Sequence, residues 1–163
     1  MNEQKSVCAA TNRMRTLIQI VALYQSAAIP YRHNSSGALE VLLVSSRRSG
    51  RWVLPKGANK RGLRPYQSAA REAFEEAGAL GVISAFEIGT YRQHKIQRNG
   101  NSVPIYVTAY PLSVQSVLQS WPEMSLRRRR WMTIGDAAIA VRDTEISAVL
   151  HAFGEAYSFD GLV

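Results

Sequence analysis

The chain has 163 residues, of which 46% are hydrophobic and 20% are charged, and this composition is typical of a single globular domain. A chain of this length buries a core without disulfide or metal staples. Cys8 is the only cysteine, which excludes an internal disulfide and fits a reducing cytoplasm. The net charge of +8 favours phosphorylated metabolites, nucleic acid or an anionic membrane surface as partners, although a generic basic surface explains the charge equally well.

The N-terminal residues differ in composition from the rest of the chain. Residues 1–15 contain no apolar stretch typical of a signal peptide, and we expect a short mobile tail before one domain over residues 16–163. Residues 17–24 are apolar but too short to span a bilayer. We therefore expect a cytoplasmic protein without membrane attachment.

The first elements are predicted to be strands. Residues 18–24 and 26–31 are apolar and form one bent strand or two, and Leu39–Ser45 is a strong candidate for a buried strand. The intervening Asn-Ser-Ser-Gly sequence at 34–37 is typical of a turn, which predicts a hairpin. A polar, basic loop over residues 46–50 follows.

A helix is predicted after the Gly-rich, basic segment of residues 56–64. Pro65 suits the first helical position, since its missing N–H would have no partner there, and Gly78 is a natural C-terminal stop. The predicted helix therefore covers Pro65–Ala77. Its apolar stripe is expected at the helical spacing of Ala70, Ala73, Phe74 and Ala77.

The second half of the chain predicts further strands and a last helix. Residues 85–96 and 103–110 are expected to be strands joined around Asn-Gly at 99–100, and residues 131–134 are expected to be another. Asp143 or Thr144 caps the last helix, whose apolar stripe is Ile146, Val149, Leu150 and Phe153. This order predicts an α/β (α+β) fold, in which helices cover both faces of a mixed sheet.

The central helix carries three glutamates that predict a metal site. Glu72 lies three and four residues before Glu75 and Glu76, so all three carboxylates are expected on one side of the helix. Like charges at this spacing cost about a few tenths of a kcal/mol per pair, and a hard divalent cation such as Mg²⁺ would offset that cost. A solvated acidic face is the ordinary explanation. The basic composition of the chain and the preceding Gly-rich basic loop favour the metal site.

These residues resemble the Nudix box, G-x5-E-x7-R-E-U-x-E-E-x-G-U, in which U is a bulky apolar residue. The matching positions are Gly57, Arg71, Glu72, Glu75, Glu76 and Gly78. The chain departs from the pattern at Leu63, where the first box glutamate should stand, and at the small residues Ala73 and Ala79. In the family that first glutamate helps to fix the loop and the box arginine, so Leu63 leaves the partner of Arg71 in doubt.

The resemblance extends beyond the box, over about residues 25–157. Residues 41–57 and the arginine-rich run that ends at Trp131 are similar to the diphosphoinositol polyphosphate phosphohydrolase branch and to related bacterial hydrolases. The fold implied is a Nudix-like α/β/α sandwich with a mixed central β-sheet. Arg130 stands where that branch often has a glutamate, which removes one accessory ligand.

The resemblance also implies roles for the box residues. Glu72 and Glu76 would bind Mg²⁺ or Mn²⁺, with the backbone carbonyl of Gly57 as a further candidate ligand. Glu75 would bind a second ion or act as the base towards the attacking water, and the sequence does not separate these roles. Arg71 would hold the glutamates in place. Metal binding lowers the pKa of a bound water and screens the charge of the phosphates.

Basic residues outside the box are candidates for phosphate binding, because arginine grips two phosphate oxygens at once and lysine acts as a point charge. They are Arg47, Arg48, Arg51, Lys56, Lys60 and Arg61. Lys56 and Arg48 are the strongest candidates, and a solvated surface explains each of the others equally well.

Other conspicuous residues are expected to be structural. If residues 127–130 form a strand, alternate arginines point to opposite faces, and a solvated edge strand or loop is the favoured interpretation. The three histidines, His33, His94 and His151, show no ligand spacing. Trp52 and Trp131 are expected in the core or in a pocket wall.

The function implied is metal-dependent hydrolysis of a phosphoanhydride bond in a nucleoside diphosphate-linked or highly phosphorylated small molecule. Diphosphoinositol polyphosphates and dinucleoside polyphosphates are the leading substrates, and the enzyme is expected to be a monomer or homodimer. One alternative is hydrolysis of the 5′ pyrophosphate end of RNA, and RNA is less favoured as a partner than a small molecule. Another is a non-catalytic, basic nucleotide- or RNA-binding module. Leu63 and Arg130 favour that module, and the intact set of Glu72, Glu75 and Glu76 argues against it.

Overall fold

A computed structural model describes residues 23–158 of the chain. The tail predicted for residues 1–15 and most of the apolar segment at 17–24 lie outside the described residues. The elements, in chain order, are β1 (Leu23–His33), β2 (Leu39–Ser45), β3 (Trp52–Val53), β4 (Lys56–Ala58), α2 (Pro65–Ala77), β5 (Ala79–Ile83), β6 (Gly89–Ile96), β7 (Ser102–Val117), β8 (Arg129–Thr133), α3 (Ile134–Ala140) and α4 (Thr144–Tyr157).

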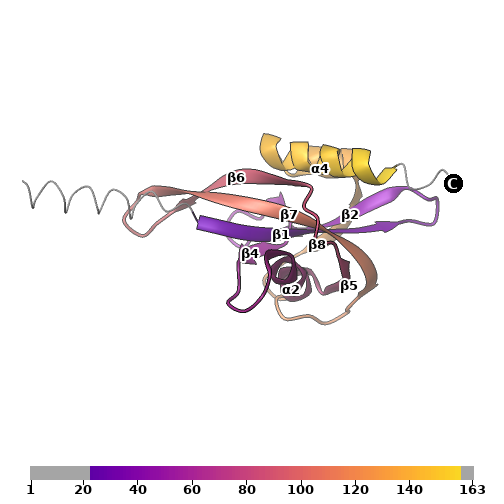
Figure 1. The fold of residues 1–163 in the computed structure, drawn as a ribbon, viewed down its shortest axis with the longest axis horizontal. Coiled ribbons are helices and arrows are strands. Elements are labelled where there is room, and N and C mark those ends of the chain that lie inside the picture. The colour runs from indigo at the N-terminus through magenta and orange to yellow at the C-terminus, as the bar shows by residue number, and fades with distance from the viewer. Residues whose placement is uncertain (1–22, 159–163) are drawn as a thin grey trace, which may run out of the picture.

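The strands form a mixed, eight-stranded sheet (Figure 1). Its main order is β3-β2-β1-β7-β5, while β4 pairs with β1, β6 with β7 and β8 with β2. The pair β1–β7 is parallel, and it aligns Leu23 with Ile105 and Tyr31 with Ser113. The other pairs are antiparallel.

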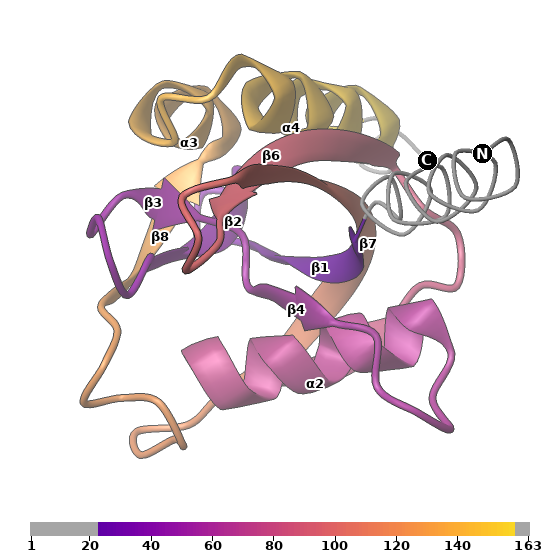
Figure 2. The ribbon, with the colours of Figure 1, turned by 90° about the vertical axis from the view of Figure 1, so that its left-hand side faces the viewer.

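Helices cover both faces of the strands, with α2 on one side and α3 and α4 on the other (Figure 2). A larger apolar cluster lies under α3 and α4 and includes Phe153, Leu150 and Val107. A smaller cluster lies under α2 and is built from alanines together with Leu42 and Leu112. The expected α/β/α sandwich with a mixed central sheet is therefore confirmed.

The predicted hairpin and helix ends are confirmed. Strands β1 and β2 are antiparallel, with Tyr31 opposite Val41, and the turn closes at Gly37, whose φ of +83° suits glycine. Helix α2 covers Pro65–Ala77 and ends at Gly78 in the left-handed conformation, with φ of 63°. Asp143 caps α4 by accepting hydrogen bonds from the backbone N–H groups of Glu145 and Ile146.

Four elements were missed, the strands β3, β4 and β5 and the helix α3, and the limits of others were misplaced. Strand β5 follows Gly78 without a break, and its exposed Leu80 and Val82 lack the alternation of a half-buried strand. Helix α3 spans Ile134–Ala140, too short a segment for a helical period to be recognised. Strand β6 starts at Gly89 instead of 85, and β7 continues past Tyr110 to Val117, because it pairs with β1, β5 and β6 in turn.

Candidate active site

The face that helix α2 turns to the sheet agrees with the predicted stripe at Ala73 and Ala77 but not at Ala70 and Phe74. Ala69, Ala73 and Ala77 are fully buried, whereas Ala70 and Phe74, which belonged to the expected stripe, are only half-buried. The expected stripe is therefore wrong by about one position, because alanines allow the helix to lie close to the sheet and leave the larger Phe74 at the margin.

This rotation places two of the three glutamates on the buried side. Glu72 is 7% exposed and Glu76 is 5% exposed, while Glu75 is half-buried. The solvated acidic face, considered as the alternative for the sequence, is wrong for Glu72 and Glu76. Buried carboxylates require charged or polar partners, so their surroundings define the site.

Strand β4 brings Gly57 against the carboxyl group of Glu72. The pairing of β4 with β1 places Gly57 opposite Ser26. A Cβ atom at position 57 would overlap the carboxyl group of Glu72 and lie 2.8 Å from its Oε2. Only glycine therefore leaves room for this close approach of backbone and carboxylate.

Each carboxylate has a cationic neighbour. Lys60 Nζ lies 3.0 Å from Glu72 Oε1 and 3.5 Å from Glu75 Oε2. Arg71 Nε lies 2.9 Å from Glu75 Oε1, so Glu75 is the partner of Arg71 in this chain. Glu76 Oε1 lies 2.9 Å from a guanidinium nitrogen of Arg127, whose side chain is only 10% exposed.

The surroundings shift the proton affinities of these groups in opposite directions. Burial raises the pKa of the Glu76 carboxyl to about 8, against the opposing effect of the Arg127 guanidinium. The hydrogen bond from Arg71 lowers the pKa of Glu75, with Lys60 acting in the same direction. Glu75 is therefore ionised more readily than Glu76, whose burial favours the neutral form.

The residues present fit a divalent cation that also binds water and substrate. Within residues 23–158, no three histidine, cysteine or acidic side chains converge as a preformed metal site. Mg²⁺ typically keeps several waters and takes one or two carboxylates together with substrate phosphates, so a full protein cage is not required. Glu72 and Glu76 are the buried carboxylates that would offer such an ion oxygen ligands, with the Gly57 backbone against Glu72.

The loop before α2 is fixed by hydrogen bonds that do not require a polar side chain at position 63, and the Leu63 backbone N–H itself donates to Lys60 O at 3.1 Å. Leu63 is 37% exposed. The Ser68 hydroxyl accepts from the backbone N–H of Lys60 at 2.9 Å, and the Gln67 side chain accepts from the N–H of Arg64 at 2.8 Å. These bonds stabilise the loop that carries Lys60 and Leu63.

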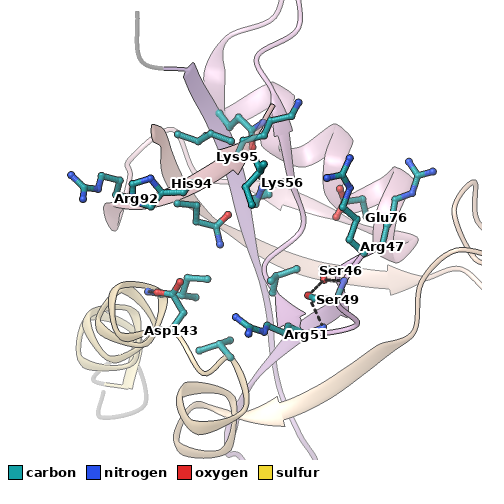
Figure 3. A pocket seen from close by; sticks show the side chains of 18 of the residues that line it. Ser46, Arg47, Ser49, Arg51, Lys56, Glu76, Arg92, His94, Lys95 and Asp143 are labelled. Carbon is teal, nitrogen blue, oxygen red and sulfur yellow. Dashed lines mark hydrogen bonds between the residues drawn. The ribbon is translucent and has the colours of Figure 1, made fainter. Parts of the chain in front are cut away.

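A cavity of about 840 Å³ opens beside Glu76 (Figure 3). Its lining is strongly basic and comprises Arg47, Arg48 and Arg51 from the loop after β2, Lys56 from β4, Arg92, His94 and Lys95 from β6, and Arg127. Glu76 and Asp143 are the acidic residues of this lining. A polyanion is therefore the kind of ligand that the cavity suits.

The structure brings most of the predicted phosphate-binding residues to this cavity. Arg47, Arg48, Arg51 and Lys56 line it, and burial lowers the pKa of Lys56. Lys60 contacts Glu72 and Glu75 instead of lining the cavity, and Arg61 is exposed on the same loop.

Sequence reasoning missed Arg127 and the β6 cations. The solvated interpretation of residues 127–130 is wrong for Arg127, which binds Glu76, and for Arg129, which binds backbone carbonyls. The predicted alternation along this run is confirmed, since these two arginines share one side and Arg128 and Arg130 are exposed. Arg92, His94 and Lys95 follow the buried Tyr91 on β6, and only their density of charge could have indicated them.

Comparison with known proteins identifies the family. The family model described as NUDIX domain matches residues 23–153. The chain therefore belongs to the Nudix hydrolase family.

Several relatives match over much of the chain. Nudix hydrolase 21, chloroplastic, of Arabidopsis thaliana is 29% identical over 132 residues, covering 77% of this chain and 63% of that protein. Diphosphoinositol polyphosphate phosphohydrolase 3-beta of Bos taurus is 36% identical over 101 residues, covering 60% of this chain and 57% of that protein. The match thus spans less than two thirds of the length of either relative.

A solved structure shows the same fold. The crystal structure of a C. elegans Ap4A hydrolase binary complex has a TM-score of 0.64 and 22% identity, covering 84% of this chain and 98% of that chain. In the part of the chain that the structure describes, no helix is both long and apolar enough to cross a bilayer.

Proposed function

We propose that this protein hydrolyses a phosphoanhydride bond of a densely phosphorylated small molecule, with Mg²⁺ or Mn²⁺ as cofactor. The observation that carries the proposal is the pair of buried carboxylates on α2, Glu72 against Gly57 and Glu76 in the lining of a cavity rich in cations. Lys60 and Arg127 contact these glutamates from the protein side. A divalent ion would bridge the same carboxylates to the phosphates of a bound polyanion.

In this proposal the residues of the Nudix box have different roles. Glu72, Glu76 and the Gly57 carbonyl hold the metal ion, which when bound activates water and neutralises phosphate charge. Glu75 takes the proton of the attacking water or contributes to a second ion. The lowered pKa of Glu75 favours the ionised carboxylate that both roles need, and it suits the metal ligand better than the base, because lowering its pKa makes a carboxylate a weaker proton acceptor. Arg71 orients Glu75 through their 2.9 Å contact.

The reaction itself is a displacement at phosphorus. The oxygen of water bonds to one phosphorus of the anhydride, the bridging P–O bond breaks, and the bridging oxygen leaves as part of a phosphate group. The proton of water passes to a carboxylate, for which Glu75 is the candidate. Arg47, Arg48, Arg51 and Lys56 bind the remaining phosphates, with Lys60 near the carboxylates.

The cavity lining supports a diphosphoinositol polyphosphate over a dinucleoside polyphosphate. No aromatic side chain lines the cavity within the described residues, and Trp52 and Trp131 lie elsewhere. Bases of a nucleotide are commonly held by aromatic stacking, whereas a phosphorylated cyclitol needs cations alone. The name of the Bos taurus relative agrees with this choice.

A second candidate function is a basic binding module without turnover. The cationic neighbours of all three glutamates favour it, since Lys60 and Arg127 already neutralise Glu72 and Glu76.

A cytoplasmic location also stays a prediction, supported by the single cysteine.

Turnover of a panel of substrates with Mg²⁺ or Mn²⁺ tests the proposal, with released phosphate as the readout. The panel holds inositol pyrophosphates, dinucleoside polyphosphates, nucleotides and 5′-triphosphorylated RNA. We expect Glu76→Gln to lower kcat by about 10²–10⁴-fold, because a metal ligand is lost while the side chain keeps its shape. Glu155→Gln, on the exposed side of α4, is the matched control.

The outcome separates the candidates. An unchanged melting temperature with lost turnover in Glu76→Gln supports the enzyme. Wild-type protein that binds these compounds but turns over none of them with either metal establishes the binding module. Strongly salt-dependent preference for RNA would redirect the substrate assignment.

A further inference from the structure

The C-terminal end of α2 is held by one segment of chain, residues 118–129, which we call the clasp. The last carbonyls of a helix have no partner within the helix and must find one elsewhere. Here the clasp supplies a hydrogen-bond donor to each of these carbonyls in turn. Glu123 N–H donates to Glu75 O at 3.0 Å, Trp121 Nε1 to Glu76 O at 3.0 Å, and Leu118 N–H to Gly78 O at 2.9 Å.

Arg129 completes this set from β8. One terminal nitrogen donates to Ala77 O at 2.7 Å, and the other donates to Leu118 O at 2.6 Å. Its guanidinium lies 3.7 Å from the ring centroid of Trp121. No carboxylate pairs with Arg129 among the described residues, so its charge faces the negative end of the α2 dipole.

Gly78 is fitted to the clasp as well as to the helix end. Its φ of +63° favours glycine. A Cβ there would lie 2.9 Å from Arg129 Nη1 and 2.9 Å from Trp121 Cβ. The clasp therefore packs directly on the turn that ends α2, and Figure 2 shows this segment, between β7 and β8, passing that end of the helix.

The clasp also joins the two halves of the site. Arg127 binds Glu76 at 2.9 Å and Glu123 at 3.1 Å, and it donates to Ser45 O at 3.1 Å. Ser45 immediately precedes the arginine-bearing loop of residues 46–51. One segment therefore contacts the metal-binding helix and the start of the phosphate-binding loop.

The packing of α2 against the sheet does not by itself fix the rotation of the helix about its axis. The buried face of α2 presents Ala69, Ala73 and Ala77, whose methyl groups form shallow ridges that interlock weakly with a neighbouring surface. Such a contact allows close approach but resists rotation poorly. A rotation of α2 would move Glu72 away from Gly57 and Glu76 away from Arg127.

We propose that the clasp sets the rotation of α2 and so holds Glu72 and Glu76 in place, which makes Arg129 and Trp121 positioning residues. This inference rests on the proposed function, because the carboxylates are positioned for a metal ion. Neither residue lines the cavity, so neither acts by touching the substrate.

The test compares Arg129→Met, Arg129→Lys and Trp121→Phe with two controls. Arg130→Met removes the neighbouring exposed arginine, and Val149→Ala destabilises the core under α4, on the opposite face of the sheet. The first readout is hydrogen exchange of the α2 amides at 73–78 in protein without metal. The second is the dissociation constant of Mn²⁺ without substrate, and the third is the separation of kcat from KM.

We expect Arg129→Met to speed exchange at 73–78, to weaken Mn²⁺ binding about tenfold and to lower kcat similarly with KM unchanged. Arg129→Lys should recover part of each effect, and Trp121→Phe should show a smaller loss. Val149→Ala should lower the melting temperature without changing Mn²⁺ affinity.

Equal exchange and equal Mn²⁺ affinity in Arg129→Met and Arg130→Met would overturn the positioning role. So would a loss of Mn²⁺ affinity in Val149→Ala that matches its loss of stability. If the wild type neither binds Mn²⁺ nor turns over substrate, the proposed function fails and the positioning role fails with it. If the wild type turns over substrate but Arg129→Met leaves the exchange of the α2 amides unchanged, only the role of the clasp is rejected.

Discussion

Helix α2 and the loop of residues 46–51 both face the same cavity, yet they are built in opposite ways. Glu72 and Glu76 are 7% and 5% exposed and each has a cationic partner, whereas Arg47, Arg48 and Arg51 are largely exposed. Those three arginines have no carboxylate partner among the described residues. The positions of the two carboxylates are therefore fixed by contacts within the protein, whereas the three arginine side chains can adjust their positions to a ligand.

This difference matches what the two regions have to do. Reacting groups lose about 10²-fold in rate when misplaced by about 1 Å, so the carboxylates need a rigid support. Charged side chains that bind the outer phosphates of a substrate contribute affinity over a wider range of positions. Substitutions at Gly57 and at the glutamates of α2 should therefore lower kcat, and substitutions of the loop arginines should raise KM.

Among substitutions that leave the glutamates in place, the largest effect is expected from Gly57→Ala. The added Cβ overlaps the Glu72 carboxyl group, so either the side chain or β4 must shift. We expect kcat to fall about 10²-fold, with KM little changed, because the ligand oxygens move apart. Steady-state kinetics and a thermal melt measure both quantities.

Gly135→Ala is the matched control, since no atom lies within 4 Å of a Cβ added there. Its kcat should equal that of the wild type. Full activity in Gly57→Ala would mean that the close approach of Gly57 and Glu72 has no part in the reaction.

The sequence predicted the rigid region in outline but not in orientation. The limits of α2 followed from Pro65 and Gly78, whose backbone preferences act locally. The rotation of α2 did not follow, because alanine and phenylalanine both count as apolar while only alanine allows close contact with the sheet. The buried position of Glu72 and Glu76 is thus a tertiary effect.

Contacts between distant segments explain the other omissions. Arg127 binds Glu76 from 51 positions along the chain, and Trp121 reaches its carbonyl from 45 positions away. No periodicity within residues 118–129 indicates those partners. By contrast, Arg47, Arg48 and Arg51 were found because a basic loop after a buried strand is a local pattern.

A smaller effect is expected from the exposed loop. Arg48→Ala removes a cation from the cavity lining and should raise KM about tenfold with kcat unchanged, since a charge-assisted hydrogen bond to phosphate is lost. Arg98→Ala, an exposed arginine outside the lining, controls for net charge. An equal change of KM in both variants would show that Arg48 acts only through the net charge of the protein.

Lys60 connects the two regions, and its replacement gives the smallest effect. Its ammonium lies 3.0 Å from Glu72 Oε1, where it competes with a metal ion for the same oxygen. Lys60→Met should therefore tighten Mn²⁺ binding in the absence of substrate by about two- to fivefold, the range expected for one partly exposed ion pair. Titration of Mn²⁺ by calorimetry measures the change. Arg61→Met removes an exposed cation of the same loop and should change the affinity less. Weaker Mn²⁺ binding in Lys60→Met would instead assign Lys60 to the support of Glu72, which would extend the rigid region into the loop before α2.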